Sequence, residues 1–479
     1  MAHQDEIELK FELDSDAADR VRTHPLLAKA DRRDWFQRTT YFDTEDGKLR
    51  NEGYTLRVRQ IDDRFTQTVK TSSRSAGLFE RQEWESAVRG MKPDCSALED
   101  TPLARLNYLG RLEPVSRFAV KRTSWTVNID RSSIEVVLDS GRFSAARRKA
   151  PLHELEIELK KGNPRAIFTL ARKLSNAARL EIGVLSKDER GFLLARNMLG
   201  NEQKASASTV QRDMDIGEAV VLFVHECVRQ LRLSQPAIVT RRDPDALHQA
   251  RLAIRRLRSL FSFFRPAIPR NTLDPLRTQL RSFIEPFGQA RNLDVFLARH
   301  GKELPSDDRR KLSRARGNAY GEVIEAMESQ RSRDLFLDLI EWASTRRRAK
   351  SGVTDSLENF AGKQLDTMWE KIKRKSSMLP FLEENEIHRL RIAIKKMRYA
   401  LEFMAGLYSA KKVGKFTEGL GNIQDCLGEL HDDMFERQLI DTMSLDLVLR
   451  AEGAGRSRAL ERAQAHFRRL RKLDRVWSG

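Results

Sequence analysis

The sequence predicts an α+β protein in which an antiparallel β-sheet or barrel precedes an all-helical part. Two observations carry this prediction. Residues 1–160 contain short runs in which apolar and polar residues alternate, whereas almost everything after residue 212 has helical periodicity. Two blocks of the second half also recur at one common offset, since residues 247–258 return as 387–398 and residues 287–293 return as 427–433. This repetition indicates a duplicated helical unit with an approximate two-fold axis.

The strands are expected where alternating residues are bounded by glycine, by Asp-Asp pairs or by serine clusters. Such boundaries are typical of antiparallel hairpins. The runs that meet this description are residues 7–13, 54–59, 65–70, 83–88, 124–129, 134–138 and 152–160.

Helices are expected from residue 163 onward. Asn163-Pro164 is a helix-start signal, and the apolar residues after it recur with helical spacing, at Ile167, Leu170, Leu174 and Ala178. A second helix is expected near Lys187. Residues 201–212 are small and polar, so we predict a first domain over 1–200, a linker over 201–214 and a helical domain over 215–479.

The charge points to an anionic partner. The chain of 479 residues has a net charge of +18 and a hydrophobic content of 40%, which suits a globular protein. Residues 1–200 carry 36 basic and 31 acidic side chains, and residues 201–479 carry 51 and 38, so the excess lies mainly in the second part. The net positive charge by itself is compatible with three kinds of partner, which are nucleic acid, an acidic membrane and polyphosphate.

Other sequence features favour the cytoplasm. Cys95, Cys227 and Cys426 lie too far apart to suggest a metal site or a disulfide framework. No signal peptide is visible at the N-terminus, and no apolar stretch is long enough to span a membrane. We therefore expect a cytoplasmic protein with no membrane segment.

Charged residues repeat at every second position on several predicted strands, so they share one face of the sheet. A solvated face would explain any one strand alone. The intervening residues are apolar, however, and must pack against something, such as the flanking helices. We therefore expect the charged face to line the interior of a barrel. The charged positions are Glu6, Glu8, Lys10, Arg57, Arg59, Glu154, Glu156, Glu158 and Lys160.

A lumen of this composition calls for two kinds of ligand. Clustered carboxylates repel one another without a cation, and oxygen ligands suit Mg²⁺ or Mn²⁺. Clustered arginine and lysine call for an anion rich in oxygen, and phosphate fits the arginine fork. Metal and polyanion together indicate phosphoryl transfer.

An ExExK motif opens the first part of the chain, at Glu6-Ile7-Glu8-Leu9-Lys10. It is followed in order by Tyr41-Phe42-Asp43-Thr44, Leu56-Arg57-Val58-Arg59, Thr68-Val69-Lys70-Thr71, Glu83-Trp84-Glu85, Arg122, Leu138-Asp139, residues 154–159 and Ser186-Lys187. Through this ordered set, residues 3–198 resemble the CYTH, or triphosphate tunnel metalloenzyme, superfamily.

This resemblance implies an eight-stranded tunnel with flanking helices that hydrolyses a short triphosphate with Mg²⁺ or Mn²⁺. It assigns metal binding to Glu6, Glu8, Asp139, Glu156 and Glu158. It assigns triphosphate binding to Lys10, Arg57, Arg59, Lys70, Arg122 and Lys187. Arg57, Arg59 and Lys70 are also expected to act in catalysis. Lys70 is either the water-activating base, if burial among cations lowers its pKa, or a further phosphate contact.

The second part carries two basic stripes that match in position and charge. At about 100° per residue, each set of four basic residues lies on one side of a helix, opposite an apolar face. A solvated surface would explain one stripe, whereas two matched copies favour a binding function. The stripes are His248, Arg251, Arg255 and Arg258, and His388, Arg391, Lys395 and Arg398.

Residues 215–475 resemble the CHAD domain, through these stripes and the Gly-x-x-Arg/His-Asn/Asp motifs at Gly288 and Gly428, which are expected to be turns. The resemblance implies two pseudo-symmetric four-helix bundles that bind inorganic polyphosphate. Nucleic acid is disfavoured because few aromatic residues accompany the stripes. Polyphosphate binding further suggests an association with polyphosphate granules.

The sequence therefore predicts an inorganic triphosphatase joined to a polyphosphate-binding domain. Two alternatives stay open. One is a polyphosphate-binding scaffold without catalysis, which the full set of carboxylates disfavours. The other is nucleotide chemistry of the adenylate cyclase type, which needs a purine pocket that no sequence feature identifies.

Overall fold

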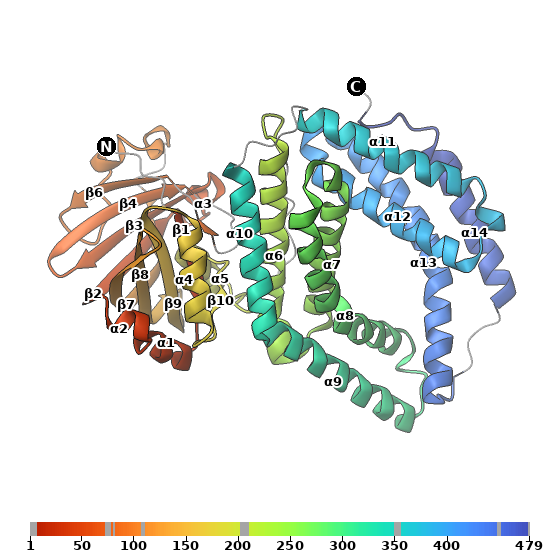
Figure 1. The fold of residues 1–479 in the computed structure, drawn as a ribbon, viewed down its shortest axis with the longest axis horizontal. Coiled ribbons are helices and arrows are strands. Elements are labelled where there is room, and N and C mark those ends of the chain that lie inside the picture. Colours follow the sequence, from red (N-terminus) through yellow and green to blue (C-terminus); the bar gives the residue numbers. More distant parts are fainter. Residues whose placement is uncertain are drawn as a thin grey trace. The chain divides into compact units, whose positions relative to one another are not determined.

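The computed structural model describes residues 7–71, 78–79, 82–106, 111–201, 210–348, 356–447 and 452–477. The chain divides into two compact units. One consists of residues 1–203 with two further segments, 232–237 and 328–341, and the other holds the remainder. The first unit is built on a β-sheet and the second is helical, as Figure 1 shows. The predicted order of an antiparallel sheet followed by helices is confirmed.

A single antiparallel sheet forms the centre of the first unit. Its main path runs β10-β1-β9-β8-β7-β2-β3-β4-β6, and β5 pairs with β1. The strands are β1 (Ile7–Glu12), β2 (Asp31–Asp43), β3 (Tyr54–Ile61), β4 (Arg64–Thr71), β5 (Leu78–Phe79), β6 (Glu83–Val88), β7 (Glu113–Ile129), β8 (Ser132–Ala145), β9 (Arg148–Lys161) and β10 (Glu181–Ile182).

The expected eight-stranded, closed tunnel is wrong for the described residues. Nine strands follow one another along the path, and no strand pair there joins β6 to the far end and closes the sheet. The free edge of β1 is shared by two short strands, since β5 pairs with Glu8 and Leu9 while β10 pairs with Phe11 and Glu12. A strand as short as β5 or β10 cannot show alternation, so the sequence pattern could not predict either one.

The apolar face of the sheet forms the core of the first unit, as the alternation predicts. On one part of this face Leu56, Val58 and Val69 pack with Leu49 of α3 (Lys48–Asn51). Another part packs with Leu194 of α5 (Lys187–Ala195). Further helices of this unit are α1 (Ser15–Arg22), α2 (Pro25–Ala28) and α4 (Arg165–Ser175), and α4 contacts β1, β8 and β9.

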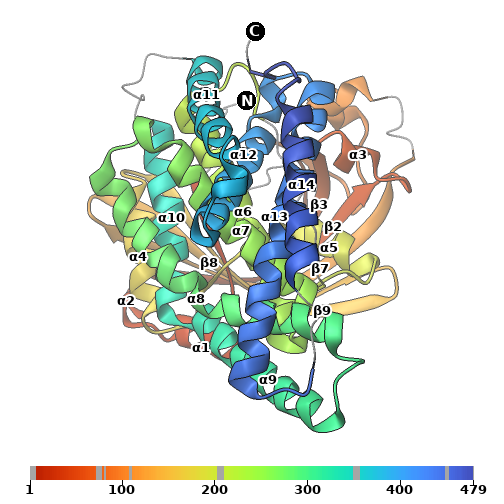
Figure 2. The same cartoon turned by 90° about the vertical axis from the view of Figure 1, so that its right-hand side faces the viewer.

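The second unit contains the predicted repeat. The helices α7 (Pro244–Phe263) and α8 (Arg270–His300) are followed at one common offset by α12 (Glu384–Phe403) and α13 (Ala410–Met443), respectively. The other helices after residue 215 are α6 (Ile216–Arg241), α9 (Ser306–Glu328), α10 (Gln330–Arg348), α11 (Leu357–Ser376) and α14 (Glu452–Leu470). Residues 232–237 of α6 and residues 330–341 of α10 belong to the first unit. Figure 2 shows α13 and α14 side by side. No helix of the described chain is both long enough and apolar enough to cross a membrane.

One prediction about the repeat is wrong. The glycine motifs at Gly288 and Gly428 lie inside α8 and α13 rather than in turns. Glycine is a common turn signal, but it is also used where a neighbouring group must approach the backbone closely. At both positions that neighbour is an arginine side chain, described below.

Because the apolar face forms the core, we expect substitutions on it to lower the free energy of unfolding. Ile157 of β9 is fully buried, so Ile157→Ala should lower the free energy of unfolding by about 2–5 kcal/mol, because it removes buried methyl groups and leaves a cavity. Lys149→Ala, at an exposed position of the same strand, should change it by no more than about 0.5 kcal/mol. Urea denaturation measures both, and equal effects would contradict the assignment of the faces.

Candidate functional site

The charged face of the sheet lines a cavity of about 680 Å³. Its wall includes most of the residues predicted from the sequence, namely Glu8, Lys10, Arg57, Arg59, Lys70, Arg122, Glu156, Glu158 and Lys187. Asp139 does not line the cavity and is almost fully buried behind its wall. Glu6 lies outside the described residues.

Strand register places like charges next to one another. Glu158 of β9 lies directly opposite Glu8 on one neighbouring strand and Glu135 on the other. Opposed carboxylates destabilise a sheet unless a cation compensates for them. Lys160 supplies one such cation, because its Nζ lies 2.6 Å from Glu158 and 3.0 Å from Glu135.

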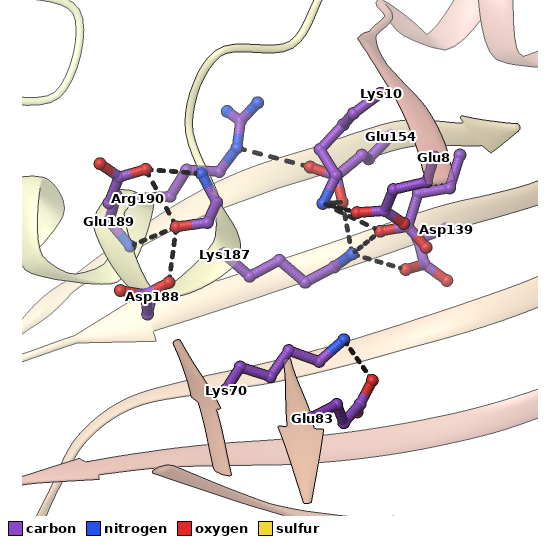
Figure 3. Close-up of polar contacts among 12 residues, drawn as sticks. Glu8, Lys10, Lys70, Glu83, Asp139, Glu154, Lys187, Asp188, Glu189 and Arg190 are labelled. Carbon is purple, nitrogen blue, oxygen red and sulfur yellow. Dashed lines mark hydrogen bonds and ion pairs between the residues drawn. The ribbon is translucent and has the colours of Figure 1, made fainter. Parts of the chain in front are cut away.

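Two buried lysines meet a cluster of carboxylates deeper in the same wall, as Figure 3 shows. Lys187 Nζ lies 3.0 Å from oxygens of both Asp139 and Glu156, and it also donates to Glu154. Lys10 Nζ lies 3.1 Å from Glu156 and 3.6 Å from Glu8 and from Glu154. The two ammonium groups thus share one set of buried acids.

These contacts shift the pKa values of Lys187 and Glu156 in opposite directions. Burial alone would lower the pKa of Lys187, but Glu154, Glu156 and Asp139 hold that pKa well above its usual range. Burial alone would raise the pKa of Glu156, yet Lys187, Lys10 and Arg122 hold it well below its usual range. The charged forms of Lys187 and Glu156 therefore stabilise each other.

Local structure places Lys187 at this point. Ser186 is the N-cap of α5, and it forms a capping box in which its side chain meets the Glu189 backbone while the Glu189 carboxylate accepts from the Ser186 backbone. Lys187 is consequently the first residue of the helix. The structure thus confirms the helix predicted near this lysine.

Arg122 of β7 is fixed by a forked contact. Its Nε and Nη2 donate to the two oxygens of Asp139 at 2.7 and 2.6 Å, and Nη2 also donates to Glu156 at 3.2 Å. Such bidentate pairing sets the orientation of a guanidinium. Asp139 therefore already serves two cations, Arg122 and Lys187.

Two arginines of β3 that line the cavity have spare hydrogen-bonding capacity. The Nε atoms of Arg57 and Arg59 are buried and have no hydrogen-bond partner among the described residues. Burial, followed by the nearby charges of Arg57 and Arg122, lowers the pKa of Arg59 to about 10. A buried cation crowded by other cations would be stabilised by an anion in the cavity.

Lys70 contacts a carboxylate of the same cavity. Its Nζ lies 2.8 Å from Glu83. Glu83 also accepts from Arg57 at 3.3 Å. Burial opposes ionisation of Glu83, but Lys70 and Arg57 lower its pKa. The role of Lys70, as the water-activating base or as a phosphate contact, stays a prediction.

The carboxylates fit a divalent cation. Oxygens of Asp139, Glu154 and Glu156 lie within 4.8 Å of one another, and Glu8 and Glu158 face each other on adjacent strands at the cavity. A hard ion such as Mg²⁺ or Mn²⁺ prefers oxygen donors of this kind. The residues present are therefore compatible with the predicted metal.

Four acidic residues of the cavity were not assigned by sequence reasoning, namely Glu83, Glu85, Glu135 and Asp188. Glu83 and Glu85 occur two positions apart on β6, and Glu135 begins a similar alternation on β8. The same alternate spacing that identified the other strands could have assigned Glu83 and Glu85. Their cross-strand partners, which decide their role, were not readable from spacing.

The two basic stripes of the helical unit have the predicted faces. Ile254, Leu257 and Phe261 are buried, whereas the stripe residues of α7 and α12 are exposed or half-buried. The helices α7 and α12 contact one another. Arg255 of α7 helps to lower the pKa of His388 of α12, after burial and the charges of Arg391 and Lys395. The stripes therefore lie within electrostatic reach of each other.

Further cations extend this surface beyond the predicted residues. Burial is the largest cause of a lowered pKa at Arg258, and Arg281, Arg255 and Arg277 add to it. Burial also lowers the pKa of Arg251 to about 10, together with the charges of Arg255 and Arg291. We call the two stripes with Arg277, Arg281 and Arg291 of α8 the basic face. Its α8 members could not be placed beside the stripes from sequence spacing alone.

A glycine lies beneath one arginine in each copy of the repeat. A Cβ atom on Gly288 would lie 3.5 Å from Nη1 of Arg251, and one on Gly428 would lie 3.3 Å from Nη2 of Arg391. The two glycines are separated in sequence by the same interval as the two arginines. The two copies thus reproduce the packing of this arginine as well as its charge.

Comparison with known families divides the chain in the same order. A model of the CYTH domain matches residues 4–192, and a model of the CHAD domain matches residues 223–441. An inorganic triphosphatase from Haemophilus influenzae is 30% identical over 204 residues, which is 40% of this chain and 54% of that protein. The matched region thus spans about half the length of this relative.

Two solved structures align with parts of the chain at low sequence identity. The CHAD domain of the plant Ricinus communis is 22% identical, with a TM-score of 0.47, over 57% of this chain and 93% of that one. A Hippeastrum protein, described as a candidate adenylyl cyclase with a dominant triphosphatase activity, is 18% identical, with a TM-score of 0.31, over 40% and 95%.

The buried lysine cluster makes a prediction about stability. Lys187→Met leaves the carboxylates of Asp139, Glu154 and Glu156 without one of their buried cations, so it should cost about 3–5 kcal/mol of unfolding free energy. Urea unfolding in EDTA measures this, since the chelator keeps a metal ion from replacing the ammonium. Lys160→Met is the control, because this lysine is half-exposed and its removal should cost no more than about 1 kcal/mol. Losses of equal size would contradict the description of the cluster.

Proposed function

Because this chain carries a CYTH domain at residues 4–192 followed by a CHAD domain at residues 223–441, we propose that it is a metal-dependent hydrolase of inorganic triphosphate or a related short triphosphate. We propose also that its helical part binds inorganic polyphosphate. One observation carries the first proposal: carboxylates on β1, β8 and β9 and cations on β3, β4 and β7 line a single cavity.

The cations of the cavity suit a short phosphate chain. Arg57 and Arg59 each have a buried Nε atom that can donate to a phosphate oxygen. Lys10, Lys187 and Arg122 line the same cavity and add positive charge beside the carboxylates. The triphosphatase relative supports this choice of substrate.

We propose Glu8, Glu156 and Glu158 as metal ligands because they line the cavity. Asp139 and Glu6 complete the set expected from the resemblance. A divalent cation held there supplies charge neutralisation at the phosphate oxygens.

The proposed reaction is attack of water on the terminal phosphorus. A bond forms between the water oxygen and phosphorus, and the bridging P–O bond breaks, which releases phosphate and pyrophosphate from triphosphate. Such transfers depend mainly on positioning and charge neutralisation. Arg57, Arg59 and Arg122 would hold the phosphate chain in line. Lys70 would donate to it while Glu83 orients the Lys70 ammonium.

The basic face supports polyphosphate binding by the helical part. Its cations come from α7, α8 and α12, and their charges add to burial in lowering the pKa values of Arg251, Arg258 and His388. A flexible polyanion would relieve this repulsion along the whole face, and its binding would release counterions.

One assay tests the enzyme proposal against its alternatives. The purified chain is offered triphosphate, thiamine triphosphate and ATP with Mg²⁺ or Mn²⁺, and phosphate, pyrophosphate and cyclic AMP are measured. We expect phosphate from triphosphate and its loss in EDTA. Cyclic AMP as the main product would identify a cyclase. No turnover of any of the three would favour a scaffold.

Arg59→Ala should lower kcat/KM for triphosphate by about 10²–10³-fold, which corresponds to about 2–4 kcal/mol for one preorganised donor. The reason is that Arg59 supplies the cavity with a buried cation whose Nε is not otherwise used. Steady-state kinetics measures the loss. Arg64→Ala, in an exposed residue at the start of β4, is the control and should be unchanged. Unchanged kinetics for Arg59→Ala would remove this arginine from the proposed site.

Replacing Arg251, Arg255, Arg391 and Lys395 together with Ala should remove most binding of long-chain polyphosphate by the full chain. Ala keeps the helices, because it has the best helix propensity. The slope of log affinity against log salt should also fall by about 3, since four cations are lost. Calorimetric titration at several salt concentrations measures both. Normal binding by this fourfold variant, or equal binding of duplex DNA by the original chain, would contradict the proposal.

A further inference from the structure

Glu154 is a buried carboxylate to which the proposed reaction assigns no role. It lies on β9, and its side chain is fully inaccessible to solvent. Strand register places it opposite Glu12 on β1 and Asp139 on β8, so three acids lie side by side. A carboxylate is unfavourable at such a buried position unless nearby cations compensate for it.

The two oxygens of Glu154 face different cations. Oε1 accepts from Lys187 and lies 3.6 Å from Nζ of Lys10. Oε2 has no hydrogen-bond partner among the described residues, and it lies 3.8 Å from Nε of Arg190. Arg190 in turn contacts Glu12 at 2.7 Å. Figure 3 shows Lys10 and Lys187 on one side of this carboxylate and Arg190 on the other.

Glu154 does not line the cavity, although the lysines that it contacts do. Lys10, Lys187 and Glu156 line the cavity, whereas Glu154 does not. A ligand in the cavity would therefore meet the lysines and not Glu154.

We propose that Glu154 is a positioning residue, which holds the ammonium groups of Lys187 and Lys10 at the cavity wall so that they contact the substrate. This inference rests on the proposed triphosphatase function. Without the charge of Glu154, the carboxylates that remain beside Lys187 in the described part of the chain are Asp139 of β8 and Glu156 of β9. The ammonium group is then drawn toward those acids and away from its position for phosphate.

The test compares Glu154→Gln with the parent in full-length protein that carries the fourfold Ala replacement, so that the basic face does not bind the probe. Inorganic triphosphate is titrated in EDTA by calorimetry. We expect its affinity to fall about tenfold, the loss of one charge-assisted contact. In hydrolysis, KM should rise about tenfold while kcat changes little. Glu154→Asp keeps the charge and should recover part of the loss.

A second measurement separates positioning from metal ligation. Binding of Mn²⁺ without triphosphate is followed by electron paramagnetic resonance. Glu154→Gln should bind Mn²⁺ as the parent does, and Glu8→Gln should bind it more weakly. Loss of Mn²⁺ binding in Glu154→Gln would overturn the inference, because it would make Glu154 a ligand of the metal.

The remaining outcomes are also decisive. Arg190→Met should weaken triphosphate binding only through Glu154, so the double variant with Glu154→Gln should be no weaker than Glu154→Gln alone. A fall in kcat with unchanged KM would indicate a merely structural role and overturn the inference. If the parent neither binds nor hydrolyses triphosphate, the proposed function itself fails. If the parent does both and Glu154→Gln equals it, only the role of Glu154 fails.

Discussion

The first unit depends on the burial of charges that neutralise one another inside a sheet whose other face is apolar. Lys10 and Lys187 can be buried because Asp139, Glu154 and Glu156 surround them, and each group would be unstable there alone. The sheet must therefore keep the register that brings these residues together. Its apolar face must also be covered by helices, since apolar side chains stabilise the fold only where they are removed from water.

The sequence predicts which side chains share a face of each strand. It does not predict which side chains on neighbouring strands contact one another. Alternation correctly placed Leu9 and Ile157 in the core and Glu8 and Glu158 at the cavity. It could not show that Glu83 pairs with Lys70, because that contact joins two different strands. The long strand β2 was not among the predicted runs, since its first half carries many charged residues, and the short strands β5 and β10 show no alternation.

In the helical unit too, features of single helices were predictable from the sequence, whereas contacts between helices were not. The sequence repeat predicted matched helices, and the starts of α7, α8, α12 and α13 have its spacing. The stripes were predictable because they lie on single helices. The arginines of α8 join them only through helix packing, which spacing does not encode. Glycine in the helix interior was mistaken for a turn, since turn propensity and close packing favour the same residue.

The glycine beneath each repeated arginine constrains how far the two copies can diverge. Gly288 and Gly428 lie in helix interiors, where glycine costs about 0.5–1 kcal/mol relative to alanine, so random substitution would tend to remove them. A side chain larger than a methyl group would occupy the space of the guanidinium of Arg251 or Arg391. We therefore expect glycine and arginine to be kept or lost together during evolution, whereas Arg255 and its counterpart Lys395 can exchange one cation for another independently.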